Sequence, residues 1–184
     1  MPRRDQSDPF VELLDRARAD QAIAERARER SLREQAAEGA TFAGVLVDLA
    51  EHAAPVTLRT VAGRTHRATV AAVGADVVML RTAAGEDVLV RLGAVATVRA
   101  RPGGRLHAAG RDRKPRGARL LEVLSTLAPE RPRVSVVTTG SVDPVRGDLV
   151  AVGTDVVTLR LEGDAALCAI RASAITEIAV VPAG

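Results

Sequence analysis

The stretch that decides the fold is VGADVVMLR at positions 73–81, because it returns almost unchanged as VGTDVVTLR at positions 152–160. A second stretch, VRLGAVATV at 90–98, returns as IRASAITEI at 170–178, so the spacing between the copies grows by one residue from the first stretch to the second. A nearly constant spacing with one such shift is typical of a duplicated unit with one insertion in a hairpin. In a chain of 184 residues, this repeat predicts two small domains.

Short β-branched runs separated by turn residues make up most of each copy. They span 56–61, 66–73, 76–81, 87–92 and 94–99 in the first copy, and 134–138, 146–152, 155–161, 167–171 and 174–181 in the second. Because Val and Leu alternate at two-residue spacing, one face of each strand is expected to point inward. We expect five short twisted strands per copy to close around an aliphatic core, with the fourth and fifth strands available to pair with a neighbour.

Helices are expected before both sets of strands. Residues 8–38 contain neither Pro nor Gly after Pro9 and are rich in strong helix formers, which predicts one long helix. Its apolar residues cluster near its start, which favours a helix that docks by one end, or an oligomer-forming arm, over a regular coiled coil. A short helix opens each copy, since the apolar face of Phe42, Val45, Leu46 and Leu49 recurs in the second copy as Leu120, Val123, Leu124 and Leu127.

A strongly basic segment joins the two copies. Residues 99–119 hold eight basic residues and one acid, a net charge of +7, whereas the whole chain has a net charge of only +3. Its Gly and Pro residues make it a poor helix or strand, so we expect a linker or a long loop. The chain therefore divides into a charged N-terminal arm (1–40), a first barrel (41–100), a basic linker (101–117) and a second barrel (118–184).

This order of a short helix and five strands, closing in a hydrophobic-Arg-x-x-Ala run, resembles the Sm or LSm fold over residues 41–100 and 118–181. The resemblance implies a mainly β protein with helices: a long N-terminal helix followed by two tandem Sm-like, SH3-like five-stranded barrels. The arginine of the family's Ile-Arg-Gly motif corresponds to Arg91 and Arg171, but the glycine is missing twice. The base-reading Asn corresponds to Val78 and Val157. Other SH3-like barrels, including the PRC-barrel, show a similar strand rhythm.

The sequence shows no set of residues in an arrangement typical of catalysis. His52, His66 and His107 lack the spacing of metal ligands, and the single Cys168 excludes an intrachain disulfide and a multi-thiolate metal site. The repeated Asp76 and Asp155 follow a turn glycine closely, so we expect them to accept backbone N–H bonds within that turn. The repeated Arg81 and Arg160 are expected to face outward. We predict a non-enzymatic protein without a cofactor or a metal.

The sequence indicates no targeting signal. No run approaches the roughly 20 continuous apolar residues that a membrane span needs. The two arginines at the start are followed by no apolar run, so a secretory signal is not indicated. We expect a soluble, cytoplasmic protein that makes no contact with a membrane.

The basic segment is the strongest functional candidate from sequence. A flexible arm with this charge gains from counterion release on a phosphate backbone, so we expect binding of nucleic acid, RNA or DNA and more readily RNA. The scarcity of aromatic residues argues against base stacking, and binding would then be mainly electrostatic. A solvated tether is the plain alternative. The candidate residues are Arg99, Arg101, Arg105, Arg111, Arg113, Lys114, Arg116 and Arg119, with help from Arg91 and Arg171, for which a structural or interface role is favoured.

A second hypothesis makes the chain a protein–protein assembly or adaptor module. In it, the long helix and the free barrel edges bind a protein partner or another copy of the chain, and no nucleic acid is bound.

Overall fold

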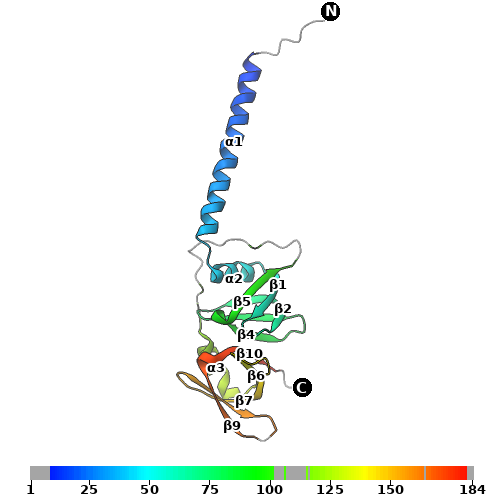
Figure 1. Ribbon diagram of the computed structural model, residues 1–184, viewed down its shortest axis with the longest axis vertical. Helices are drawn as coiled ribbons and strands as arrows, with labels where there is room; N and C mark the ends of the chain where they lie inside the picture. The colour runs from blue at the N-terminus through cyan, green and yellow to red at the C-terminus, as the bar shows by residue number, and fades with distance from the viewer. Residues whose placement is uncertain (1–8, 102–105, 107–114, 116, 164, 182–184) are drawn as a thin grey trace, which may run out of the picture.

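The computed structural model describes residues 9–101, 106, 115, 117–163 and 165–181. These residues form one long helix, two short helices and a β-sheet of ten strands (Figure 1). We call residues 42–100 the first half and residues 118–180 the second half.

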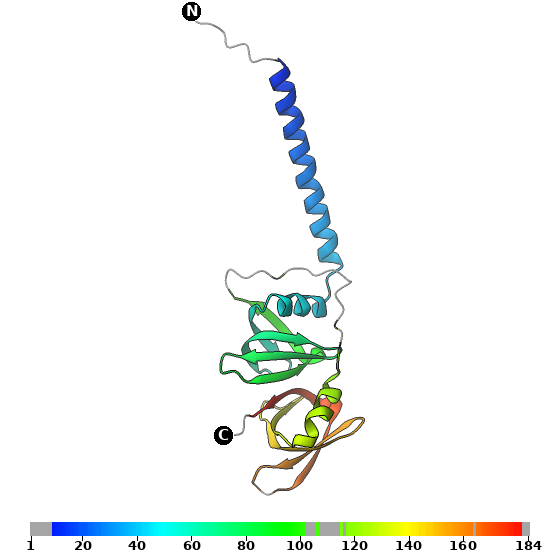
Figure 2. The same cartoon turned by 180° about the vertical axis from the view of Figure 1, so that it is seen from behind.

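The long helix stands apart from the sheet. Helix α1 (Pro9–Glu38) projects away from both halves in Figures 1 and 2. Its side chains are almost all exposed where they are described, and those of its early apolar cluster lie outside the described part. Helix α2 (Phe42–Glu51) follows, with the Thr41 hydroxyl accepting a hydrogen bond from the Gly44 N–H at 3.0 Å, which caps its first turn. None of the described helices is both long and apolar enough to cross a membrane.

Each half consists of a short helix and five strands, with a 3-10 turn between the fourth and the fifth. The first half contains β1 (Pro55–Thr60), β2 (Thr65–Val73), β3 (Val77–Thr82), β4 (Asp87–Arg91), η1 (Leu92–Ala94) and β5 (Val95–Ala100). The second contains α3 (Leu120–Leu127), η2 (Ala128–Glu130), β6 (Arg133–Thr138), β7 (Val145–Val152), β8 (Val156–Leu161), β9 (Leu167–Arg171), η3 (Ala172–Ala174) and β10 (Ile175–Val180). Every strand lies within one residue of the bounds expected from the sequence.

The prediction of two separate five-stranded barrels is wrong. All ten strands form a single antiparallel sheet in the order β5-β1-β2-β3-β4-β10-β6-β7-β8-β9. The halves join where β10 pairs with β4, in the register Glu177↔Val90, Ile178↔Leu89 and Ala179↔Val88. The sheet is not closed, because β5 and β9 are its two ends. The edge of β4 in the first half pairs with the edge of β10 in the second half. Two strand edges, one from each half, are therefore no longer exposed.

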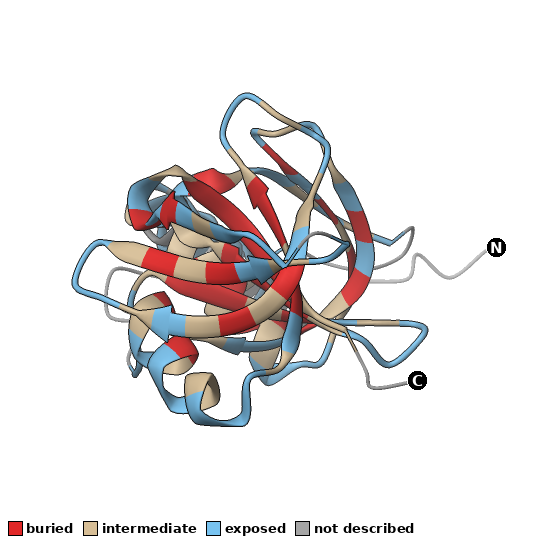
Figure 3. Cartoon of the chain, turned by 90° about the horizontal axis from the view of Figure 1, so that it is seen from below, coloured by how far each residue is buried: buried red, intermediate tan, exposed pale blue. Residues whose placement is uncertain are grey.

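The two hydrophobic clusters overlap across this junction. One cluster contains mainly residues of the second half, but it includes Val77 and Leu89 of the first. The other belongs to the first half, and Ala179 of β10 packs against it. Figure 3 shows the buried residues concentrated along the strands, with the loops exposed. Packing the halves together therefore enlarges both cores, as expected for units of this size.

Candidate assembly interface

The structure places only half of the residues predicted to bind nucleic acid. Five of them lie outside the described residues: Arg105, Arg111, Arg113, Lys114 and Arg116. Arg99 on β5, Arg101 just after it and Arg119 before α3 are exposed. Arg91 and Arg171 occupy matching places at the ends of β4 and β9, but their surroundings differ completely.

Arg91 ties the two halves together. Its guanidinium donates to two backbone carbonyls of the second half, from Nη2 to Ala172 O at 2.9 Å and from Nε to Ile175 O at 3.3 Å. Its Nη1 lies 3.4 Å from Asp76 Oδ2 in its own half. Charge-assisted hydrogen bonds of this kind are stronger than neutral ones. Arg91 thus acts as a structural clamp in this conformation.

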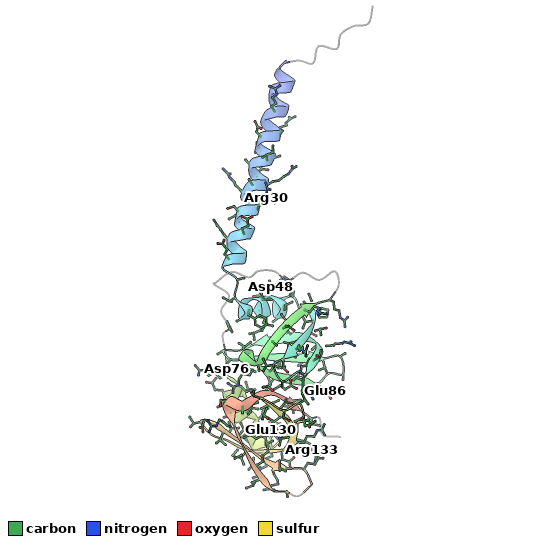
Figure 4. The ribbon with its side chains drawn as sticks, in the orientation of Figure 1. Arg30, Asp48, Asp76, Glu86, Glu130 and Arg133 are labelled. Atoms are coloured by element: carbon green, nitrogen blue, oxygen red, sulfur yellow. The ribbon has the colours of Figure 1, made fainter. Side chains whose placement is uncertain are left out.

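Asp76 and Gly74 hold the start of α3 against the first half. The Leu120 N–H, at the first turn of α3, donates to Asp76 Oδ1 at 2.7 Å (Asp76 is labelled in Figure 4, where the halves meet). The sequence predicted that this carboxylate would accept an N–H of its own turn, whereas the N–H that it accepts belongs to the other half. The Ala75 N–H donates to Ala118 O at 3.2 Å, and a Cβ on Gly74 would clash with this same carbonyl oxygen. Gly74 is therefore needed for the close approach.

A buried ion cluster completes the junction. Glu177 of β10 is only 3% exposed, and its carboxylate contacts Arg64 Nε at 2.7 Å and His66 Nε2 at 2.8 Å. A carboxylate in this position needs both partners, because an unpaired buried charge is strongly unfavourable. Sequence reasoning missed this cluster. The available signal was an acid at the centre of an otherwise uncharged strand, ITEIAV.

The same elements recur beside β8 and β9, without a partner among the described residues. The counterparts of Gly74, Asp76 and Arg91 in the second copy of the repeat are Gly153, Asp155 and Arg171. All three are exposed, and Asp155 and Arg171 have no side-chain hydrogen bond or ion pair in the described part of the chain. Strand β9 pairs with β8 on one side only. Leu167, at its start, is 66% exposed.

The opposite end of the sheet also has a strand without a neighbour on one side. Strand β5, the counterpart of β10, pairs only with β1. Leu120, whose N–H binds Asp76, is fully buried, whereas its counterpart Phe42 at the start of α2 is 44% exposed. The end strand β9 thus corresponds to β4 of the central junction, and the end strand β5 corresponds to β10. Neither end strand has a neighbour on its outer side in the described sheet.

Strands β2, β1 and β5 carry an outward basic surface, which we call the arginine face. Arg67 and Arg99 lie directly opposite Thr57 in the two strands next to it, and Arg59 follows two residues later on β1. All three arginines are exposed and have no ion pair among the described residues. None of these three strands contains an acid. Only Arg99 of this face was predicted from the sequence.

The remaining polar groups of the described residues include three side chains singled out in the sequence, those of a histidine, a cysteine and an arginine. No group of three potential metal ligands occurs among them. His52 Nδ1 lies 2.8 Å from the Asp48 carbonyl of its own helix, and Cys168 is half-buried in β9. Arg81 is exposed, as predicted, and donates from Nε to Asp87 Oδ1 at 2.8 Å. This hydrogen bond lowers the pKa of Asp87 below its usual value.

A polar hollow of about 390 Å³ lies beside the junction, lined among others by Asp76, Arg91, Arg119 and Asp155. Its charged groups include those that clamp the halves, so we assign it to the junction itself.

No family model matches this chain, and no curated protein matches it. The resemblance to the Sm fold therefore stays a prediction.

Proposed function

We propose that this chain is a protein-assembly module whose β9 edge accepts a strand from another polypeptide, in the way that β4 accepts β10. The observation that carries the proposal is the contrast between two edges of related sequence. One edge is paired and clamped, and the other is open with the same Asp and Arg exposed beside it.

The β9 edge lacks several of the features with which proteins protect an open strand, although it is short and ends in the charged Arg171. It reads LCAIR, without Pro or Lys, and its ladder with β8 runs in unbroken register over five residue pairs. An exposed edge with unpaired N–H and C=O groups is a template for another strand. Leu167 and Ala169 add an exposed apolar strip on the same face as Arg171, since they alternate along the strand.

A charge placed on this strip tests the proposal. Ala169→Lys introduces an ammonium on the exposed side of the edge, and Ala151→Lys does the same on β7, which has strands on both sides. We expect the wild-type chain to show a mass above that of a monomer in sedimentation velocity. Ala169→Lys abolishes this association, and Ala151→Lys preserves it. A wild-type chain that stays monomeric at all concentrations refutes self-association, and equal loss in both variants refutes the role of β9.

The arginine face supports a second candidate function, electrostatic binding of nucleic acid. Arg59, Arg67 and Arg99 are exposed and unpaired in the described structure, and Arg99 is also the first residue of the basic segment. Thr57 and Thr97 add hydroxyl donors between them. Such a surface contacts phosphates without reading bases, so we expect affinity to fall steeply with added salt.

Two sets of substitutions separate the face from the basic segment. Neutralising Arg59, Arg67 and Arg99 to Gln tests the face, and neutralising Arg111, Arg113, Lys114 and Arg116 tests the segment. The matched control is Arg146→Gln, because Arg146 is the exposed counterpart of Arg67 in the second half. The measurement is fluorescence anisotropy with a 30-nucleotide single-stranded RNA and the corresponding duplex DNA at two salt concentrations. Binding that survives both sets of substitutions contradicts this candidate.

A further inference from the structure

We infer that the start of helix α1 docks into an apolar groove beside α3 of a second copy of this chain. The inference rests on the proposed function in one respect, because association through β9 brings two copies together, but the contact itself is a different one. Its basis is an apolar groove that no described residue covers, and an apolar helix start that lies away from both halves.

The groove lies where the two halves meet. Two adjoining hollows of about 210 and 260 Å³ share Ala118 and Val123 as lining residues. The first hollow is lined only by apolar residues and a glycine, which come from β2, β3 and β4 of the first half and from the α3 region of the second. The larger apolar side chains of the two hollows are Val73, Val77, Met79, Leu89, Val123 and Leu127.

This apolar lining is partly open to solvent. Val73 and Met79 on one wall, and Val123 and Leu127 on the other, are half-buried in the described structure. Contiguous apolar surface that is left open in this way is typical of a site for another polypeptide. The groove therefore offers side chains of both halves to one ligand.

The start of α1 has the pattern of a helix that fills such a groove. Phe10, Leu13, Leu14 and Ala17 follow the i, i+3, i+4, i+7 spacing, which places these four positions on one face of α1. Positions 10–17 extend over about 12 Å of helix, the same length as the eight residues of α3. This face is therefore long enough to lie along the whole of α3.

The groove that this helix start reaches belongs to another copy. Helix α1 has 30 residues, a length of about 45 Å, and it projects away from both halves in Figures 1 and 2. Its start is the part of the helix that lies farthest from its own halves. A neighbouring copy can approach it there.

The charges beside the groove match those beside the helix face. Glu122 is exposed and lines the second hollow, and none of the residues described as lining the two hollows is a base. On α1, the exposed Arg16 and Arg18 border the apolar face, whereas the acids at positions 12 and 15 fall on the opposite face at helical spacing. Docking thus brings the basic border of α1 toward the Glu122 carboxylate.

The contact adds to the association through β9 and does not replace it. Two turns of helix in a groove bury much less surface than the roughly 1,200 Å² at which stable interfaces begin. Once β9 holds two copies together, docking of α1 takes place within the assembly, at a high effective concentration. Ala169→Lys therefore removes both contacts, whereas loss of α1 docking weakens association without abolishing it.

Paired substitutions on α1 test the docking face in the full chain. The double variant Leu13→Asp with Leu14→Asp places two charges on this face. The control, Ile23→Asp with Leu32→Asp, makes the same change at two exposed positions farther along the same helix. We expect the first double variant to weaken association about tenfold in sedimentation velocity, and the control to match the wild-type chain.

A charge in the groove tests the other side of the contact. Ala72→Lys places an ammonium among the lining residues, and Ala151→Lys places one at the exposed counterpart in the second half. We expect Ala72→Lys to weaken association as much as the double variant on α1, and Ala151→Lys to have no effect.

A photoreactive benzophenone side chain in place of Phe10 locates the contact directly. Irradiation should link it to residues 72–79 or 118–127, which include the groove. A mixture of nitrogen-15-labelled and unlabelled chains shows from the mass of the linked peptides whether the link joins two copies. The same group in place of Ile23 should give no link to these residues.

The outcomes separate this inference from the proposed function. Association that requires β9 but is unchanged by Leu13→Asp with Leu14→Asp overturns the inference and leaves the proposed function standing. Links within one chain, or links to other segments, also overturn it. Equal weakening by the two double variants overturns the assignment of the contact to the start of α1. A wild-type chain that never associates overturns both.

Discussion

The β4 and β9 edges show how one sequence pattern acquires two different surroundings. Both strands end in an arginine that follows a small apolar run, and both lie beside a Gly-x-Asp turn. At β4 the arginine, the aspartate and the glycine all contact the other half, through the Ala172 carbonyl, the Leu120 N–H and Ala118. At β9 the same three residues are exposed. The chain uses an edge of this kind once internally, and we propose that the β9 edge is a second contact surface.

The side chains that differ between the two edges are as informative as those that agree. Leu89 at the junction is replaced by Ala169, and Asp87, which pairs with Arg81, is replaced by Leu167. The β9 edge is smaller at the first of these places and more apolar at the second. It keeps the aspartate and the arginine of the clamp but has less side-chain volume where Leu89 packs, so the proposed contact should form and break more readily than the internal one.

The largest expected effect comes from removing the buried acid of the junction. Glu177→Ala leaves Arg64 and His66 without their partner, and we expect the free energy of unfolding to fall by about 3 kcal/mol. Its counterpart Thr97→Ala, on the open β5 edge, should change the stability by less than about 0.5 kcal/mol. Urea unfolding of both variants measures the contrast. Equal losses would show that Glu177 does not hold the two halves together.

A smaller effect is expected from the two turn glycines. A Cβ at either Gly74 or Gly153 meets a valine of its own hairpin, at 3.0 and 2.9 Å, but only the one at Gly74 also meets the Ala118 carbonyl. We expect Gly74→Ala to destabilise the fold by about 1.5 kcal/mol more than Gly153→Ala, since the backbone at Ala118 must move. Thermal unfolding of the pair isolates the contribution of the junction. A greater loss of stability in Gly153→Ala than in Gly74→Ala would contradict the importance of the close approach between Gly74 and Ala118.

The smallest expected effect is a pH dependence confined to the first half. The hydrogen bond from Arg81 lowers the pKa of Asp87, so this pair stabilises the fold above the usual pKa of a carboxyl group, near 4, and loses its effect as the pH falls through the lowered value. Arg81→Gln should lower the Tm slightly at pH 7, and the difference should vanish in strong acid. Arg160→Gln, whose partner on β9 is Leu167, is the control. A Tm difference that grows as the pH falls would contradict the expected loss of the Arg81–Asp87 stabilisation in acid.

Local sequence patterns predicted the elements well, because strand propensity and turn glycines act within a few residues. They predicted the strands on both sides of Gly74, whereas the structural or interface role favoured for Arg91 came from the resemblance to the Sm fold and its missing base-reading Asn. They did not predict that β10 would pair with β4, because either closure of each half or pairing between halves satisfies the same apolar alternation. The Glu177–His66 contact joins residues 111 positions apart, and nothing local to either residue points to the other.

The central claim is that the β9 edge is an open copy of the β4 edge, and backbone hydrogen exchange tests it most directly. The exchange of the β4 and β9 amides should be measured at low and high protein concentration, with Ala169→Lys as the reference for an unpaired edge. We predict slow exchange on β4 at both concentrations, and exchange on β9 that is fast at low concentration and slow at high concentration. Exchange on β9 that stays fast at every concentration would contradict the claim.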